Sequence, residues 1–152
     1  HRLFHAIPFL YKIHKSHHVS TAPTAVAAYS FNPIEGILFG IFLPAYCCGL
    51  TMLFGGILKT TLMTCAFLQV IQSLVIHCGY ELVGAEHFES SWKSEFLTPT
   101  FHDRHHEQPN CNFSGFFTWW DDWLGTADKD WRIKYASWRR NGRDCVLLEK
   151  EE

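Results

Sequence analysis

Residues 37–58 read ILFGIFLPAYCCGLTMLFGGIL, a run of 22 residues that contains no charged side chain. After Lys59, a second uncharged run extends over residues 60–76. A helix needs about 20 apolar residues to cross a hydrocarbon core of about 30 Å, so the first run is long enough and the second is marginal. Gly55 and Gly56 predict a tight turn between the runs. The pattern therefore predicts a helical hairpin that enters a membrane and returns to the side it left.

The alternative is a pair of buried helices in a soluble bundle. Neither run carries the polar stripe of an amphipathic helix, although Gln69, Gln72 and Ser73 make part of the second run polar. Pro44 predicts a kink in the first helix, which membrane helices tolerate. Charged residues make up 18% of the chain, below the usual quarter of a soluble domain. The membrane interpretation is therefore favoured, with the Gln-bearing face directed at protein or a cavity.

A hairpin returns the chain to one face, so residues 1–20 and the segment from His77 onward are expected on the same side. The basic residues on that side include Lys12, Lys15, Lys93 and Arg104, against Lys59 alone at the turn. The positive-inside tendency then places this side in the cytosol. The net charge of −2 provides no basic patch, so no nucleic-acid partner is expected.

The expected fold is all-α, with a membrane hairpin over about residues 36–76 and a cytosolic histidine-rich helical cap. The 152 residues suffice for one domain. We expect a catalytic core over residues 1–126, followed by a polar C-terminal tail over residues 127–152. The chain begins within a motif and without an initiator Met, so we expect an N-terminal truncation that removes further membrane helices. Six cysteines without a CxxC pair predict no disulfide framework.

Ten histidines are the unusual feature, and eight of them fall into three clusters. The clusters are an HxxxH at His1 and His5, an HxxHH at His14, His17 and His18, and a second HxxHH at His102, His105 and His106. Spacings of three and four place side chains on one face of a helix. A single HxxxH is often accidental, whereas three such clusters are not. Eight imidazoles exceed what one ion binds, so the clusters predict two metal ions with open coordination positions.

Two further residues are candidates beside the clusters. His77 ends the second apolar run at the expected membrane surface, where an ionisable residue is a candidate ligand. Glu81, one helical turn later, is a candidate ligand or a residue that orients a histidine. The alternative for both is an interfacial residue that faces water. His87 lies among acidic residues and is interpreted as a solvated loop residue.

Four segments resemble the fatty acid hydroxylase/sterol desaturase superfamily: HRLFH at 1–5, HKSHH at 14–18, HCGYE at 77–81 and FHDRHH at 101–106. They occur in this order with the hairpin between them. The context is similar too, with Pro23, Asn32, Pro33 and Glu35 before the hairpin, and with FTWWD and LGT segments at 117–121 and 124–126. The resemblance covers residues 1–126. One departure is Ser114, an added residue after Asn112 and Phe113, which we expect to alter the pocket floor.

The resemblance implies a membrane enzyme that hydroxylates or desaturates a sterol or fatty acyl lipid. It implies a non-haem centre of two iron ions, O2, and electrons from NAD(P)H delivered through cytochrome b5 or a similar donor protein. Iron is favoured, with zinc as an alternative occupant. The eight cluster histidines match the family's metal-binding positions. The resemblance places the enzyme in the endoplasmic reticulum of a eukaryote or the cytoplasmic membrane of a bacterium. The HCGYE segment is closer to the sterol C4-methyl oxidase and cholesterol hydroxylase branches than to the C5-desaturase branch.

Breaking an unactivated C–H bond requires a strong oxidant, which metal centres produce from O2. We expect Trp119 and Trp120, with Trp123, to border the lipid entrance or to anchor it to the headgroups, with ordinary packing as the alternative. One rival function is a zinc-dependent membrane hydrolase with Glu81 or Asp103 as the base. The other is a non-catalytic metal- or lipid-binding paralogue, which the complete set of cluster histidines disfavours.

Overall fold

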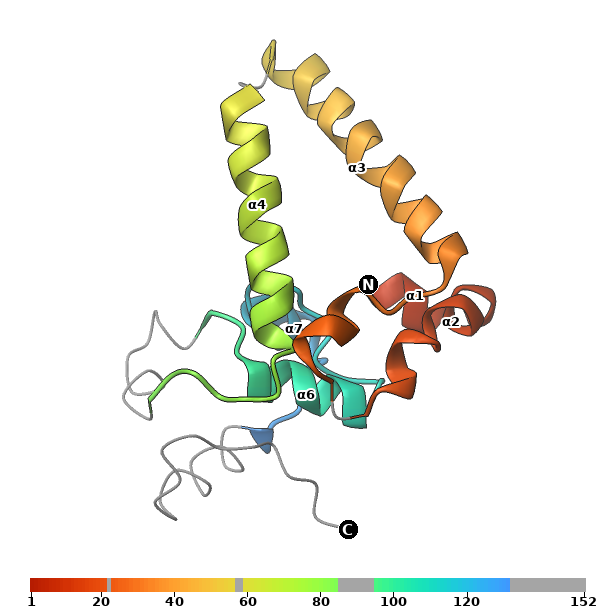
Figure 1. Ribbon diagram of the computed structural model, residues 1–152, viewed down its shortest axis with the longest axis vertical. Helices are drawn as coiled ribbons and strands as arrows, with labels where there is room; N and C mark the ends of the chain where they lie inside the picture. The colour runs from red at the N-terminus through yellow and green to blue at the C-terminus, as the bar shows by residue number, and fades with distance from the viewer. Residues whose placement is uncertain (22, 57–58, 85–94, 132–152) are drawn as a thin grey trace.

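The structure is a computed structural model that describes residues 1–21, 23–56, 59–84 and 95–131. Two long helices, α3 (Pro33–Phe54) and α4 (Lys59–Ile76), converge at their connecting turn and diverge toward a base of short helices (Figure 1). The base contains α1 (Arg2–Ala6), α2 (Pro8–His14), α6 (Pro99–Glu107) and α7 (Trp119–Leu124), with the 3₁₀ turns η1 (His17–Val19) and η2 (Ala25–Tyr29). The all-α prediction, with a helical hairpin above a histidine-rich cap, is confirmed.

Local signals set the ends of α3. The side chain of Asn32 accepts a hydrogen bond from the backbone N–H of Ile34 at 2.9 Å, and Pro33 occupies the first helical position. Gly55 ends the helix with φ +75°, a left-handed conformation that favours glycine. With 22 residues at 1.5 Å each, α3 is about 33 Å long, enough to cross a hydrocarbon core.

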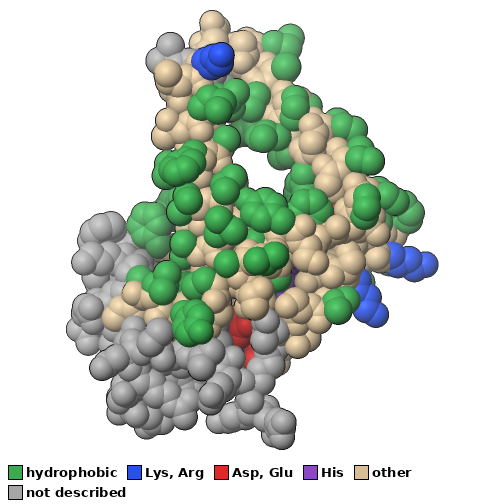
Figure 2. Space-filling view, in the orientation of Figure 1, with side chains coloured by type: hydrophobic (Ala, Val, Ile, Leu, Met, Phe, Trp, Pro, Cys, Tyr) green, Lys and Arg blue, Asp and Glu red, His purple; other side chains and the backbone are tan. Residues whose placement is uncertain are grey.

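The exposure of α3 and α4 distinguishes a membrane hairpin from a pair of buried helices in a soluble bundle. Both helices are long and apolar enough to span a membrane, and almost none of their residues is buried inside the protein. Met52 is 86% exposed and Phe42 is 64% exposed. Figure 2 shows hydrophobic side chains over both arms of the hairpin. A soluble bundle would bury such side chains, so the two helices are those of a membrane protein.

The base is fixed to the lower end of α4 by a small apolar core. Ile76, Leu97, Phe101 and Trp131 form this core, and Phe101 is fully buried. The rings of Phe101 and Trp131 meet edge to face with centroids 5.1 Å apart, an arrangement that aromatic pairs favour. Because Ile76 ends α4 and Phe101 lies on α6, this core fixes the third histidine cluster under the membrane helix.

The second histidine cluster is not on one continuous helix, which differs from the expectation. The α2 helix ends at His14, and the 3₁₀ turn η1 begins at His17. A 3₁₀ turn has three residues per turn rather than 3.6, so successive side chains point in different directions than on an α-helix. Despite this break, His14 and His18, four residues apart, still share one group of histidines, while His17 belongs to another.

Several predicted features fall outside the described residues. They are His87, Lys93, Cys145, the turn residues 57–58 and the C-terminal tail beyond Trp131. The division into a core and a tail stays a prediction. In the part of the chain that the structure describes, Cys47, Cys48, Cys65, Cys78 and Cys111 are free.

Candidate metal centre

Nine histidine side chains converge at the base of the hairpin in two groups. The five-histidine group comprises His1, His5, His14, His18 and His105, and the four-histidine group comprises His17, His77, His102 and His106. Within each group, the possible ligand nitrogens lie within 4.8 Å of one another. The structure therefore brings together all eight cluster histidines and His77. Their role as metal ligands stays a prediction.

Each HxxHH cluster contributes to both groups. On α6, His102 and His106 are four residues apart and share the four-histidine group, while His105 belongs to the other group. Residues four apart lie on one face of a helix, whereas neighbouring residues point about 100° apart. The two groups adjoin, because the rings of His18 and His106 have centroids 4.7 Å apart. Two ions bound here would be neighbours.

Burial disfavours the charged form of several of these imidazoles. His105 is fully buried and His102 is 4% exposed, and burial lowers the pKa of both well below the usual 6.5. Burial, followed by repulsion from His14, lowers the pKa of His5 and of His18 to about 3. A metal ligand must be neutral imidazole, so these side chains do not need to lose a proton before they bind an ion.

Six histidines have an oxygen atom near the ring nitrogen that faces away from the group. Nδ1 lies 2.7 Å from Phe113 O in His1, 2.6 Å from Glu35 Oε1 in His14, 3.3 Å from Ser30 O in His17, 2.7 Å from Ser73 O in His77, 2.6 Å from Cys111 O in His105 and 3.0 Å from Ser20 O in His106. These oxygens accept hydrogen bonds, so Nδ1 carries the proton. Nε2 then has a free lone pair directed at the centre.

Lone pairs directed at one another give the strongest indication of a bound cation. Nε2 of His1 lies 3.2 Å from Nε2 of His14 in one group, and Nε2 of His77 lies 3.2 Å from Nε2 of His17 in the other. Since the protons are on Nδ1, these contacts join two acceptors and are not hydrogen bonds. A positive ion between the nitrogens converts the repulsion into coordination.

Two buried nitrogens extend this observation. Nε2 of His105 and Nε2 of His106 have no hydrogen-bond partner among the described residues. An unsatisfied buried polar atom costs about 1–3 kcal/mol, and metal coordination removes that cost. An all-imidazole donor set suits iron, zinc, copper or nickel rather than magnesium or calcium. The residues present therefore fit a pair of transition-metal ions.

Glu35 is a site residue that sequence reasoning missed. It was noted only as part of the family-like segment before the hairpin, yet its carboxylate is 2% exposed and accepts a hydrogen bond from Nδ1–H of His14. Such carboxylate–histidine pairs orient metal ligands and raise their basicity. The available signal was a lone acidic residue in the first turn of an otherwise uncharged membrane helix.

Glu81 lies outside both histidine groups and contacts the start of α6 instead. Its Oε2 accepts hydrogen bonds from the hydroxyl of Thr100 at 2.7 Å and the backbone N–H of Thr100 at 3.2 Å, and its Oε1 accepts from Val83 N–H at 3.2 Å. A carboxylate at a helix N-terminus satisfies free N–H groups and interacts favourably with the helix dipole. Of the two predicted roles, this geometry favours positioning: Glu81 anchors the helix that carries the third cluster. Asp103 is buried and also lies outside both groups.

The tryptophans of α7 lie on its outer face. Trp119 is 36% exposed, Trp120 is 54% exposed and Trp123 is 69% exposed. The rings of Trp119 and Trp123 stack with centroids 5.3 Å apart. They are not part of the buried core described above, and their predicted place at a lipid entrance stays a prediction.

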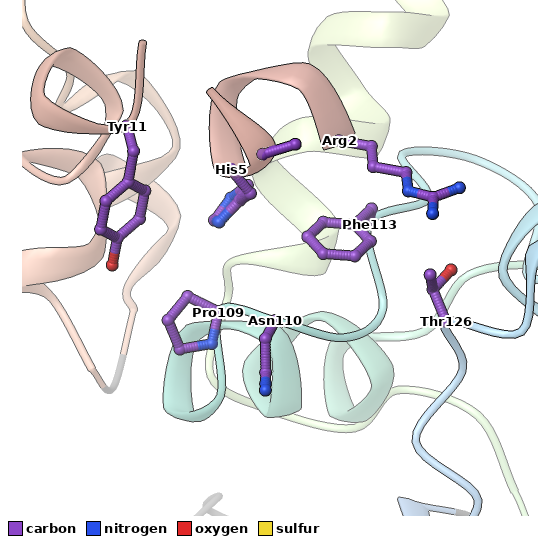
Figure 3. Close-up of a pocket in the computed structure, with 8 residues that line it drawn as sticks. Arg2, His5, Tyr11, Pro109, Asn110, Phe113 and Thr126 are labelled. Atoms are coloured by element: carbon purple, nitrogen blue, oxygen red, sulfur yellow. The ribbon is translucent and has the colours of Figure 1, made fainter. Parts of the chain in front are cut away.

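An open pocket of about 400 Å³ reaches the five-histidine group from outside. Figure 3 shows His5 between Tyr11 and Phe113, with Pro109 and Asn110 on the side of the segment that follows α6. Arg2 adds a positive charge to the rim. His5 is half-buried and His1 is exposed, so this is the side on which the five-histidine group is accessible.

Comparison with known proteins places these features in a family. The family described as "Fatty acid hydroxylase" matches residues 1–126. The methylsterol monooxygenase erg25B of Aspergillus fumigatus is 35% identical over 130 residues, covering 83% of this chain and 42% of the relative. The cholesterol 25-hydroxylase of Rattus norvegicus is 28% identical over 134 residues, with 83% and 41% covered. The C-4 methylsterol oxidase erg25 of Schizosaccharomyces pombe is 33% identical over 134 residues, with the same coverage.

These relatives agree with the branch that the HCGYE segment indicated. The chain spans about two-fifths of the length of the relatives it matches, between 41% and 42% for these three. No solved structure matches the chain.

Proposed function

The chain belongs to the fatty acid hydroxylase family, and from that premise we propose that it is the core of a membrane-bound di-iron oxygenase that hydroxylates or desaturates a lipid. The observation that carries the proposal is the pair of histidine groups whose free Nε2 atoms lie about 3 Å apart without protons between them. One ion in each group accounts for both sets of contacts. The names of the relatives support an oxidoreductase that acts on a sterol or a related lipid.

Iron is the proposed metal, with five histidines for one ion and four for the other. When bound, the metal pair supplies the activation of O2 with electrons from outside, which oxidation of a C–H bond requires. Neutral imidazole ligands leave the centre more positively charged than a carboxylate-rich site would be. Glu35 offsets part of that charge from behind His14, and the backbone carbonyls hold the protons on Nδ1.

The place of the centre supports a lipid substrate. Both groups lie at the base of the hairpin, beneath the exposed apolar surfaces of α3 and α4, so a lipid can reach them from the bilayer without crossing water. Burial of most of the histidines keeps water away from the reacting centre. We place Trp119 and Trp120 at the lipid entrance, where their ring N–H groups can face the headgroups.

The remaining parts of the proposal follow the family resemblance. The histidine centre faces the cytosol, and electrons come from NAD(P)H through cytochrome b5 or a similar donor. The enzyme lies in the endoplasmic reticulum of a eukaryote or in the cytoplasmic membrane of a bacterium. Residues 1–126 form the catalytic core, and Trp131, within the tail over residues 127–152, packs against Phe101 of that core.

Lipid analysis under ¹⁸O2 tests the activity. Membranes that contain the full-length protein and NADH are expected to produce a modified lipid, with one ¹⁸O atom if the reaction is hydroxylation and a loss of two hydrogens if it is desaturation. The His105→Ala and His17→Ala variants are expected to produce none, while His87→Ala, at a predicted loop residue, retains the activity. A lipid product that forms equally without O2 contradicts the proposal, and O2-independent ester hydrolysis with zinc supports the hydrolase instead.

A further inference from the structure

The loop after α6 provides the backbone acceptors for two histidines of one group. Cys111 O accepts from Nδ1 of His105 at 2.6 Å, and Phe113 O accepts from Nδ1 of His1 at 2.7 Å. Both histidines belong to the five-histidine group. Residues 111–114 therefore form an orienting loop for that group.

The four-histidine group has different acceptors. The oxygen atoms near its Nδ1 atoms belong to Ser30, Ser73 and Ser20, which precede the third cluster in the chain. None of these three carbonyls belongs to the orienting loop. A change confined to the loop thus acts on the carbonyls that face one group and leaves those of the other group in place.

Asn112 gives the orienting loop an unusual conformation. It has φ 56° and is fully buried. A left-handed conformation costs a non-glycine residue about 1–2 kcal/mol, less for Asn, whose side chain forms local hydrogen bonds. Here the side-chain amide donates to Phe101 O at 3.0 Å, and Oδ1 accepts from Asp128 N–H at 2.7 Å. The loop therefore needs external contacts to keep this shape.

Asp121 on α7 supplies the remaining contacts. Its Oδ1 accepts from Phe113 N–H at 2.9 Å and from the hydroxyl of Thr126 at 2.6 Å. Its Oδ2 accepts from Ser114 N–H at 2.8 Å and from the Ser114 hydroxyl. The carboxylate is 2% exposed, and all four contacts are with donors. Because a backbone N–H faces each oxygen, both oxygens must act as acceptors, as those of a carboxylate do.

We propose that Asp121 is a positioning residue that holds the 111–114 loop in the shape in which its carbonyls orient His1 and His105, and thereby controls metal binding by the five-histidine group alone. The inference rests on the proposed two-metal function. Asp121 belongs to neither histidine group, so it acts through the loop. Asp121 also explains how the loop accommodates the added Ser114, because the backbone N–H and the hydroxyl of Ser114 both donate to Oδ2 of Asp121.

The substitution Asp121→Asn changes one acceptor oxygen into an NH2 group. That group faces a backbone N–H of Phe113 or Ser114, so two donors oppose each other in a buried place. The loop then shifts, and its carbonyls no longer fix the imidazoles. Substitutions behind metal ligands typically lower metal affinity by about 10–100-fold. We expect that loss in the five-histidine group and no change in the four-histidine group.

Zinc titration of the full-length metal-free protein in detergent tests the inference. Competition with a chromophoric chelator measures the affinity of each site. Two sites are expected in the unsubstituted protein, one of which is weakened by about 10–100-fold in Asp121→Asn. Asp122→Asn, at the exposed neighbouring position on α7, is the matched control and leaves both affinities unchanged.

Background variants identify the weakened site and exclude general unfolding. In a His77→Ala background the five-histidine group is the tighter site, and Asp121→Asn is expected to weaken it. In a His5→Ala background the four-histidine group is the tighter site, and Asp121→Asn is expected to leave it unchanged. Ser114→Ala keeps the carboxylate and removes one hydroxyl donor, and we expect the same selectivity with a smaller loss.

Three results separate the possible failures. Unchanged affinities in both Asp121→Asn and Ser114→Ala overturn the positioning role. Equal weakening of both sites overturns the claim that it acts on one group. An unsubstituted protein that binds no zinc, cobalt or iron contradicts the proposed two-metal function itself.

Discussion

Nδ1 of His14 lies 2.6 Å from Oε1 of Glu35, a hydrogen bond that joins the five-histidine group to the first turn of the membrane helix α3. Both side chains are buried, with 5% and 2% of their surface exposed. The metal centre and the hairpin are thus one structural unit, because a movement of the lower end of α3 moves a ligand.

Glu35→Ala is expected to weaken metal binding by the five-histidine group about 10–100-fold. The substitution leaves the Nδ1–H of His14 buried without an acceptor and removes the charge that makes this imidazole a stronger ligand. Glu35→Gln retains an acceptor without the charge and should lose less. Metal content after dialysis against a weak chelator measures both. Full metal retention in Glu35→Ala contradicts the orienting role.

Glu81→Ala separates a positioning role from a ligand role. Because its carboxylate binds Thr100 at the start of α6, its loss is expected to cost about 1–3 kcal/mol of stability. The thermal midpoint of the full-length protein should therefore fall, in the presence and in the absence of metal. The amount of metal bound per chain at saturating metal should change little. An unchanged midpoint together with loss of one ion would instead make Glu81 a ligand.

Removal of the metals is expected to destabilise the protein. Without ions, the free lone pairs of His1 and His14, and of His17 and His77, oppose each other at 3.2 Å. A ligand at 100 times its dissociation constant stabilises the native state by about 2.7 kcal/mol. Differential scanning fluorimetry in detergent should show a lower midpoint after chelation and recovery after metal is restored. A midpoint that chelation does not move would contradict the centre.

Trp120→Ala distinguishes a lipid entrance from ordinary packing. Trp120 is 54% exposed, so its loss is expected to change the free energy of unfolding by about 0.5 kcal/mol or less, as for other surface positions. A buried tryptophan would cost about 3–5 kcal/mol. If the residue borders the entrance, KM for the lipid rises while the thermal midpoint stays constant. A large fall in the midpoint would support the packing role.

Much of the fold and of the site follows from local sequence. The uncharged runs place the hairpin correctly, because length and polarity alone decide whether a helix can cross a bilayer. The i, i+4 spacings bring histidines together for the same reason that they lie on one helix face. His77 joins the four-histidine group because α4 ends just before it, at Ile76.

The rest depends on contacts that sequence spacing does not contain. The break between α2 and the 3₁₀ turn η1 inside the HKSHH segment is a choice between two helical geometries that differ little in energy, and the histidine spacing does not predict it. The role of Glu35 arises from a contact with His14, 21 residues away in the chain. Asp121 acts through a loop whose left-handed Asn112 is set by tertiary hydrogen bonds.

The most direct test of the two-metal centre is the iron content of the purified full-length protein and of two paired variants. We predict about two iron ions per chain in the unsubstituted protein, with O2 uptake driven by NADH and an electron donor. His5→Ala with His18→Ala, in one group, and His77→Ala with His102→Ala, in the other, should each retain about one ion. A single ion per chain that either pair of substitutions removes completely would contradict the two-metal centre.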